Sequence, residues 1–290
     1  MLIAGPTASG KSALALARAQ TRGGVIINAD SMQVYDTLRV ITARPGLDDE
    51  ALAEHRLYGT VPASMRFSTG EWVRAVQTVL SEIEPGREAI FVGGTGLYFD
   101  ALTKGFADVP EVSAATLIDV EQETQALDEP QRMALLRAED PVTAERLGVA
   151  DPQRVIRAIA VKRETGRPLS SFQDSQQPPI LAGWDVERMV LWPDRDILRE
   201  RIARRFAAMF DNGAVGEVEA LRGQNLDASL PAMKAIGVRE IFDWLDGVHT
   251  REEAVTLATI ATHQYAKRQR TWFRNRMGDW PRLGLGGAPI

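Results

Sequence analysis

Cysteine is absent from this chain, and histidine is scarce, since only His55, His249 and His263 occur and they lie far apart. The lack of thiols excludes disulfide bonds and thiolate metal sites, and three scattered imidazoles do not favour a zinc site. No apolar stretch approaches the roughly 20 residues that a membrane-spanning helix needs. A glycine-rich segment begins at residue 5, too early to leave room for a signal peptide. We therefore expect a cytoplasmic protein without membrane association.

Length and composition indicate a globular chain with a substantial core. With 290 residues, 44% of them hydrophobic, it has room for one large domain with an insertion or for two domains. The net charge of −5 argues against general coating of nucleic acids. The last stretch nevertheless concentrates basic residues, with Asp279 as the only acid among them: Lys267, Arg268, Arg270, Arg274, Arg276 and Arg282. Such a run is typical of a phosphate-binding surface or of a solvated helix end.

The segment Gly5-Pro6-Thr7-Ala8-Ser9-Gly10-Lys11-Ser12 matches the phosphate-binding pattern G-x-x-x-x-G-K-[ST] and follows an apolar run. In this pattern the glycines turn backbone N–H groups inward, and the positive end of the next helix favours an anion. We expect Lys11 to reach the phosphates and the Ser12 hydroxyl to ligate Mg²⁺. The motif is typical of nucleotide-binding proteins, including ATP-binding ones. It does not say which phosphate compound it holds, and a glycine-rich turn without a ligand is the alternative.

Strand-like and helix-like segments alternate along the first hundred residues. The apolar runs 2–4, 25–28 and 89–92 predict strands, and the periodicity of 11–20 and 71–83 predicts helices. This alternation predicts an α/β fold in which helices flank both faces of a parallel sheet, as in P-loop NTPases. Ligands bind at the carboxyl ends of such strands, where Asp30 and Thr95 stand.

A helical insertion is predicted at 109–187, which leaves 1–108 and 188–290 as the catalytic core. The interval lacks strand-like runs, and its helices are broken by Pro130, Pro141 and Pro152. Beyond it the sequence predicts one strand and four helices: 188–192, 194–210, 213–222, 235–245 and 251–274.

The residues alone leave several roles open. Asp30 acts either as a turn cap or as a general base. Arg154 and Arg157 bind phosphates or stay solvated, and Trp272 and Phe273 pack into a core or stack on bases. Glycines follow strand 89–92 where a nucleotide-hydrolysing enzyme usually has a metal-binding Asp, which disfavours an ATPase or GTPase. A small-molecule kinase whose insertion acts as a lid remains an alternative, as does a non-catalytic RNA-binding module.

Taken together, the motifs resemble the tRNA dimethylallyltransferases, also called tRNA isopentenyltransferases. The matching blocks appear in the family's order across almost the whole chain. Besides Gly5–Ser12 they are Asp30-Ser31-Met32-Gln33-Val34-Tyr35, Thr42-Ala43-Arg44-Pro45, Gly93-Gly94-Thr95-Gly96-Leu97-Tyr98, Asp151-Pro152-Gln153-Arg154, Ala235-Ile236-Gly237 and Lys267-Arg268-Gln269-Arg270-Thr271-Trp272-Phe273-Arg274. Three positions depart from the family's usual residues, with Arg44 replacing Lys, Ile41 replacing Gly and Val238 replacing Tyr.

The resemblance implies transfer of a dimethylallyl group from dimethylallyl diphosphate to the exocyclic amine of the adenosine 3′ of the anticodon, releasing diphosphate without ATP consumption. It implies that Asp30 is the general base, that Lys11 and Thr95 complete the catalytic set, and that Thr95 meets the target nucleotide. The diphosphate would be held by Gly5–Ser12 and Arg201, with Mg²⁺ on Ser12. An isopentenyltransferase that acts on free adenine nucleotides is the nearest enzyme alternative.

The resemblance also implies tRNA contacts along the chain. The expected residues are Asp30, Ser31, Met32, Gln33, Thr95, Gln153, Arg154, Arg157, Lys267, Arg268, Gln269, Arg270, Thr271, Trp272, Phe273 and Arg274. The helical insertion would hold the anticodon stem-loop while the basic end follows the RNA backbone. We expect a monomeric enzyme whose only cofactor is Mg²⁺.

Overall fold

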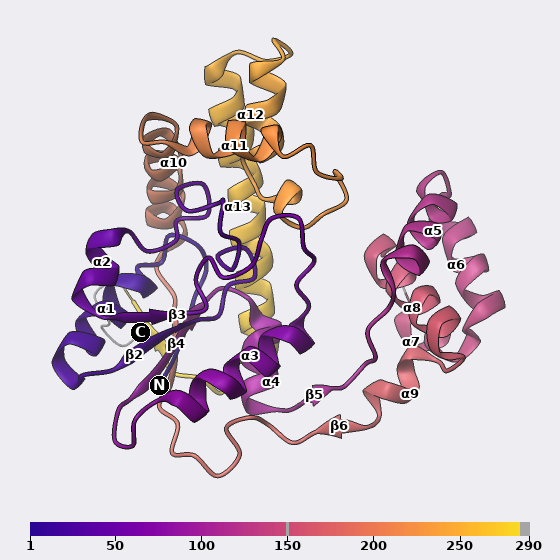
Figure 1. Ribbon diagram of the computed structural model, residues 1–290, viewed down its shortest axis with the longest axis horizontal. Coiled ribbons are helices and arrows are strands. Elements are labelled where there is room, and N and C mark those ends of the chain that lie inside the picture. Colours follow the sequence, from indigo (N-terminus) through magenta and orange to yellow (C-terminus); the bar gives the residue numbers. More distant parts are fainter. Residues whose placement is uncertain (149–150, 285–290) are drawn as a thin grey trace. The chain divides into compact units, whose positions relative to one another are not determined.

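The computed structural model describes residues 1–148 and 151–284 and divides into two compact units (Figure 1). The first unit comprises Met1–Asp100 and Gly183–Ile290, and the second comprises Ala101–Ala182. The second unit begins and ends earlier than the predicted insertion 109–187. The reason is a short antiparallel pair, β5 (Phe106–Ala107) and β6 (Gln176–Gln177), two strands that the sequence did not predict and that lead into and out of the helices.

A six-stranded sheet in the order β3-β2-β4-β1-β7-β8 forms the centre of the first unit. Its strands are β1 (Leu2–Ala4), β2 (Val25–Asn28), β3 (Glu54–Arg56), β4 (Ala89–Gly93), β7 (Arg188–Leu191) and β8 (Arg282–Leu283). Every pairing is parallel, so all the carboxyl ends lie along one edge. The predicted α/β parallel sheet flanked by helices is therefore confirmed. The short strands β3 and β8 escaped prediction because they lack apolar runs.

In the first unit, helices α1 to α4 lie beside this sheet, and α10 to α13 form a group above it in the view of Figure 1. They are α1 (Lys11–Arg22), α2 (Leu47–Leu52), α3 (Thr69–Glu82), α4 (Gly96–Thr103, which continues into the second unit), α10 (Arg195–Asp211), α11 (Ala214–Gly223), α12 (Val238–Leu245) and α13 (Arg251–Arg276), together with the 3₁₀ turn Ala232–Lys234. Leu198 and Ile202 of α10 pack with Ala266 of α13, and Ala8 of the glycine-rich loop packs against them. Two long helices thus support the loop.

The end of β2 is fixed by a buried tryptophan on α3. Ser68 caps this helix and forms a capping box with Glu71, and Trp72 follows in its first turn. The indole Nε1 of Trp72 donates to the carbonyl of Asn28 at 2.9 Å, and its ring stacks on Tyr98 with 4.0 Å between centroids. The backbone immediately before Asp30 is therefore held in a defined position.

A second core of the first unit contains the segment 34–41 and helices α10 to α13. Two of the three departures from the family's motifs lie in it, since Ile41 is 5% exposed and Val238 is fully buried. At the third departure, Arg44 Nη1 donates to the carbonyl of Tyr35 at 3.1 Å. All three side chains therefore take part in contacts within the protein.

The second unit is a small helical bundle with its own core. Its helices are α5 (Ala114–Gln125), α6 (Glu129–Glu139), α7 (Pro141–Leu147), α8 (Pro152–Thr165) and α9 (Leu169–Gln173). Pro130, Pro141 and Pro152 each lie in the first turn of a helix, where the missing N–H costs nothing, so the predicted breaks are confirmed. Val120, Leu136 and Ile159 lie at the centre of the bundle. Over residues 1–148 and 151–284, no helix is long and apolar enough to cross a bilayer.

Candidate active site

The glycine-rich loop connects β1 to α1 in a strained turn. Gly10 has φ +93°, and Ala8 has φ +62°, a left-handed value that is unfavourable for a residue with a side chain. The N–H of Ser9 donates to the carbonyl of Pro6 at 3.2 Å. A Cβ at Gly5 would lie 2.7 Å from Ser9 Oγ, so this position requires glycine. Gly5 and Pro6 are buried and form the base of the turn.

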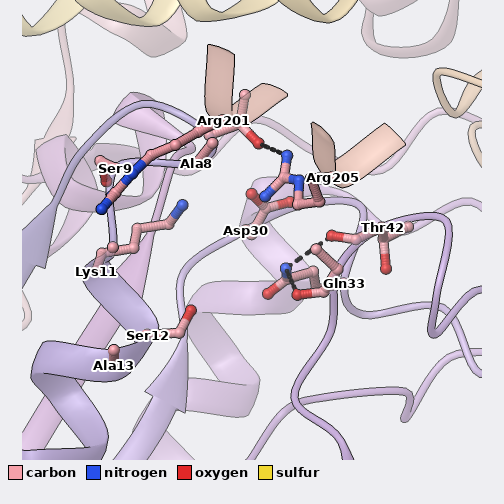
Figure 2. Close-up of a pocket in the computed structure, with 13 residues that line it drawn as sticks. Ala8, Ser9, Lys11, Ser12, Ala13, Asp30, Gln33, Thr42, Arg201 and Arg205 are labelled. Atoms are coloured by element: carbon pink, nitrogen blue, oxygen red, sulfur yellow. Dashed lines mark hydrogen bonds between the residues drawn. The ribbon is translucent and has the colours of Figure 1, made fainter. Parts of the chain in front are cut away.

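A cavity of about 320 Å³ opens above the loop (Figure 2). Its lining residues are Thr7, Ala8, Ser9, Gly10, Lys11, Ser12, Ala13, Asp30, Gln33, Thr42, Ala43, Arg201 and Arg205. The structure thus brings the loop, Asp30, Gln33 and Arg201 together, as their predicted roles require. Thr42 and Ala43 belong to a motif block that was given no site role from the sequence, and Arg205 and Ala13 were given none either.

Three cationic side chains extend into this cavity from α1 and α10 (Figure 2). Burial lowers the pKa of Lys11 to about 8; the charge of Asp30 opposes this shift, and that of Arg205 contributes to it. Arg201 Nη1 lies beside the loop, 3.6 Å from where a Cβ of Gly10 would stand. Three cations around one small space favour a multiply charged anion.

Arg205 is the main residue that sequence reasoning missed. Its Nη2 donates to Thr7 Oγ1, and burial lowers its pKa while Asp30 opposes the shift. Its Nε, like Ser9 Oγ, is buried and lacks a hydrogen-bond partner among the described residues. Unpaired buried polar atoms beside a cationic cavity fit a ligand with acceptor oxygens. The available signal was its position four residues after Arg201, on the same helix face.

Asp30 acts as a turn cap with one oxygen and keeps the other available. Its Oδ1 accepts the N–H of Met32 at 3.0 Å. Asn28 fixes the backbone on either side, because Nδ2 donates to the carbonyl of Asp30 at 2.9 Å and Oδ1 accepts the N–H of Asp30 at 2.8 Å. Over the described part of the chain, Oδ2 accepts no hydrogen bond. The cap and the general base, which the sequence left as alternatives, can therefore coexist on one carboxylate.

Thr95 lies beside Asp30 at the end of β4. Its Oγ1 accepts the N–H of Ser31 at 2.9 Å and lies close to the hydroxyl of Tyr265. Burial raises the pKa of that hydroxyl, and the charge of Asp30 adds to the shift. Tyr265 was not predicted, although it lies four residues before Gln269 on the same face of α13.

Helix α13 divides the basic segment into exposed and internal residues. Lys267, Arg268, Thr271 and Arg274 are exposed, as RNA contacts require. Gln269 is 5% exposed and donates from Nε2 to the carbonyl of Gly94 at 3.0 Å. Phe273 is 1% exposed and leaves no face for a base. We therefore assign Gln269 and Phe273 to the interior rather than to the predicted tRNA-binding set.

Two arginines of this segment also contact the protein itself. Arg270 donates to the carbonyl of Pro193 at 2.7 Å and lies 4.1 Å above the ring of Trp192. Arg276 pairs with Asp100 at 3.0 Å. Trp272 is half-buried, and its Nε1 would lie 2.0 Å from a Cβ at Gly96, so the indole fits there only because that residue is glycine. The predicted RNA contact of Trp272 is thereby restricted to its exposed edge.

The predicted contacts of the second unit lie at the start of α8. Asp151 caps this helix by accepting the N–H of Arg154 at 3.0 Å. Gln153 and Arg154 are exposed, whereas Arg157 is partly buried and donates to the carbonyl of Pro110 at 3.5 Å. Burial lowers the pKa of Arg157. The two exposed side chains thus have the accessibility that RNA contacts need.

The donor set around the cavity fits a divalent cation only in combination with a phosphate ligand. Among the residues described, no three or more His, Cys, Asp or Glu side chains group to hold a metal. The hydroxyl of Ser12 nevertheless lines the cavity. Mg²⁺ keeps much of its shell as water or phosphate oxygens and needs few protein ligands. The predicted Mg²⁺ on Ser12 remains a prediction.

A family model described as IPP transferase matches residues 33–276. The chain belongs to this family. It is 49% identical to the tRNA dimethylallyltransferase of Allorhizobium ampelinum, over 98% of this chain and 94% of that protein. It is 52% identical to the enzyme of the same name from a Methylobacterium species, over 96% of this chain and 91% of that one. The resemblance drawn from the sequence motifs is confirmed, and with it the enzyme class of a prenyltransferase.

Solved structures of this family share the fold. The tRNA isopentenylpyrophosphate transferase of Bacillus halodurans superimposes with a TM-score of 0.67 at 29% identity, covering 98% of this chain and 88% of that one. A eukaryotic dimethylallyltransferase described as acting on tRNA gives a TM-score of 0.78 at 26% identity, with coverages of 98% and 73%. The α/β architecture of this chain is therefore that of the IPP transferase family.

Proposed function

We propose that this enzyme transfers a dimethylallyl group from dimethylallyl diphosphate to the exocyclic amine of the adenosine 3′ of the anticodon in tRNA. One observation carries the proposal: the phosphate loop, three cationic side chains and Asp30 line a single cavity of about 320 Å³. A diphosphate and an acceptor amine can therefore meet within one cavity. The names of the family's relatives support the same reaction.

The phosphate loop and the cations bind the leaving group. Backbone N–H groups of the loop, Lys11 and the two arginines of α10 face the diphosphate, whose negative charge increases as the bond to the allylic carbon breaks. Donors already fixed in a water-poor cavity stabilise this charge without reorganisation. Ser12 would hold Mg²⁺, which would neutralise part of the charge on the phosphate oxygens.

Asp30 accepts the proton of the acceptor. The adenine amine attacks the first carbon of the dimethylallyl group, a nitrogen–carbon bond forms, and the carbon–oxygen bond breaks with its electron pair leaving on diphosphate. The attacking nitrogen loses a proton, and Oδ2 of Asp30, which accepts no hydrogen bond from the described residues, takes it. Oδ1 meanwhile stays on the Met32 N–H and fixes the carboxylate. The amine is a weak nucleophile, so it has to be positioned against the carbon and to lose its proton. Because the allylic carbon is reactive, these two contributions suffice.

The adenosine has to leave its stack to reach the cavity, as base-modifying enzymes require. Thr95 lies beside Asp30 and would meet the flipped nucleotide. We assign phosphate contacts to the exposed residues of α13 and anticodon-stem contacts to Gln153 and Arg154 of the second unit. The cytoplasmic location and monomeric state expected from the sequence are part of this proposal.

Incubation of unmodified tRNA with the protein, Mg²⁺ and dimethylallyl diphosphate tests the reaction, with mass spectrometry of the released nucleosides as readout. We expect one adenosine to gain a single dimethylallyl group, and the Lys11→Ala variant to give no product. Parallel reactions with AMP as acceptor and with ATP as donor test the alternatives. Prenylated AMP without prenylated tRNA, or phosphoryl transfer from ATP, would contradict the proposal.

A further inference from the structure

Gln269 is a buried amide in the middle of the basic segment of α13. Its Oε1 accepts the N–H of Thr7 at 2.8 Å, and its Nε2 donates to the carbonyl of Gly94 at 3.0 Å. The hydroxyl of Tyr265 lies close to this amide. Gln269 therefore links the phosphate loop to the turn that follows β4, and both of its polar atoms are satisfied by backbone groups.

The contact to Thr7 supports the strained part of the phosphate loop. Thr7 is held from two sides, because Gln269 binds its N–H while Arg205 donates to its hydroxyl. The next residue is Ala8, with φ +62°. Such a conformation persists only when the surrounding structure fixes it. Anchoring Thr7 therefore helps to keep the following N–H groups directed into the cavity.

The contact to Gly94 connects the same amide to the turn that carries Thr95, where the acceptor nucleotide is proposed to bind. A Cβ at Gly94 would lie 2.1 Å from Nε2 of Gln269, so the amide occupies space that only glycine leaves. The next residue is Thr95, which accepts the N–H of Ser31 and lies close to the hydroxyl of Tyr265. Helix α13 thus contacts the phosphate loop and the turn that carries Thr95 through the same amide.

We propose that Gln269 is a positioning residue that holds the phosphate loop in its diphosphate-binding conformation. It acts through Thr7 and does not touch either substrate. Its neighbours Lys267 and Arg268 are exposed on other faces of α13. If RNA binds them, as the proposed function states, its binding reinforces the position of Gln269, so tRNA and diphosphate bind cooperatively.

The test compares Gln269→Met with wild type, because methionine preserves length and removes both hydrogen bonds. The dissociation constant of inorganic diphosphate, measured by calorimetry without RNA, should rise roughly tenfold, the effect of leaving a buried backbone donor unpaired. In the Gln269→Met variant tRNA should bind within about twofold of wild type but no longer strengthen diphosphate binding. Gln264→Met is the matched control, since Gln264 is exposed on the same helix and should change neither constant.

Gly94→Ala provides a second variant in case Gln269→Met folds poorly. Its methyl group displaces the Gln269 amide at the contact with Gly94, so diphosphate affinity should fall about as much as in Gln269→Met. The double variant should lose no more diphosphate affinity than either single variant. A lowered melting temperature with unchanged diphosphate affinity in the folded variants would assign Gln269 a purely structural role and overturn the proposal. Because diphosphate binding is measured without RNA, this outcome is independent of whether the wild-type enzyme prenylates tRNA.

Discussion

We expect the ammonium group of Lys11 to make diphosphate affinity depend on pH near neutrality. The side chain is 9% exposed, and burial lowers its pKa to about 8. Only the protonated form attracts the diphosphate. Between pH 7 and 9 the protonated fraction of the free enzyme falls from about nine-tenths to about one-tenth. Affinity should therefore fall roughly tenfold for each pH unit above this pKa, until the higher pKa of the complex is reached.

Protein stability should change in the opposite direction. In the unfolded chain Lys11 titrates near 10.5, so between pH 8 and 10.5 the unfolded state binds more protons than the folded state. The contribution of Lys11 to the free energy of unfolding therefore rises with pH across this window. A loss of affinity there cannot be attributed to this residue destabilising the fold.

The assay is calorimetric titration of a non-transferable, sulfur-bridged analogue of dimethylallyl diphosphate at several values between pH 7 and 9.5. Lys11→Arg is the control, because a guanidinium stays charged throughout this range and should remove the pH dependence. A wild-type affinity that stays flat over this range, or an equal decline in Lys11→Arg, would refute the assigned role of the ammonium.

Three further predictions concern other residues. Asp30→Asn should lower single-turnover rates by roughly 100-fold or more while tRNA affinity is retained, and near-normal rates would exclude it as the base. Arg205→Ala should lower kcat by roughly 100-fold, whereas the exposed neighbouring variant Arg204→Ala should not, and equal rates for the two would remove Arg205 from the site. Arg274→Ala should raise the KM for tRNA and reduce the log–log salt slope of binding by roughly 0.7 to 0.9, but Arg276→Ala, which loses an ion pair, should mainly lower the melting temperature. A higher KM for tRNA in Arg276→Ala and a lower melting temperature in Arg274→Ala would contradict our assignment of Arg274 to RNA contact and Arg276 to the protein's own ion pair.

The phosphate loop and the central strands could be predicted because their signals are local. Each of the four central strands is a short apolar run, the loop motif is complete, and the sheet aligns the residues that follow its strands. The sequence alone therefore sufficed to place Asp30 at the cavity above the loop and Thr95 against the neighbouring turn. Site residues that directly follow a strand could therefore be predicted from the sequence.

Residues supplied by distant helices could not be placed in this way. The sequence predicted a helix at 194–210, and the resemblance singled out Arg201 on it, but choosing Arg205 requires the rotation of that helix against the loop. The same holds for α13, where a charge run does not show which members face inward. Gln269 is buried there because α13 packs against α10 and the phosphate loop, and Phe273 is buried one turn further along the helix. These contacts span almost the whole chain, so no local pattern encodes them.

The three departures from the family's motifs show how such substitutions should be interpreted. Ile41 fills the space beside Gly237, where an added Cβ would lie 2.6 Å from its side chain, and Val238 follows within the same buried cluster. Arg44 passes so close to Gly59 that a Cβ there would meet its guanidinium, and it binds the carbonyl of Tyr35. All three contacts are internal, and none of the three residues lines the cavity, although Thr42 and Ala43 between Ile41 and Arg44 do. Variation at these positions should therefore alter packing within the protein, whereas the groups to which we assign diphosphate binding and proton acceptance are retained.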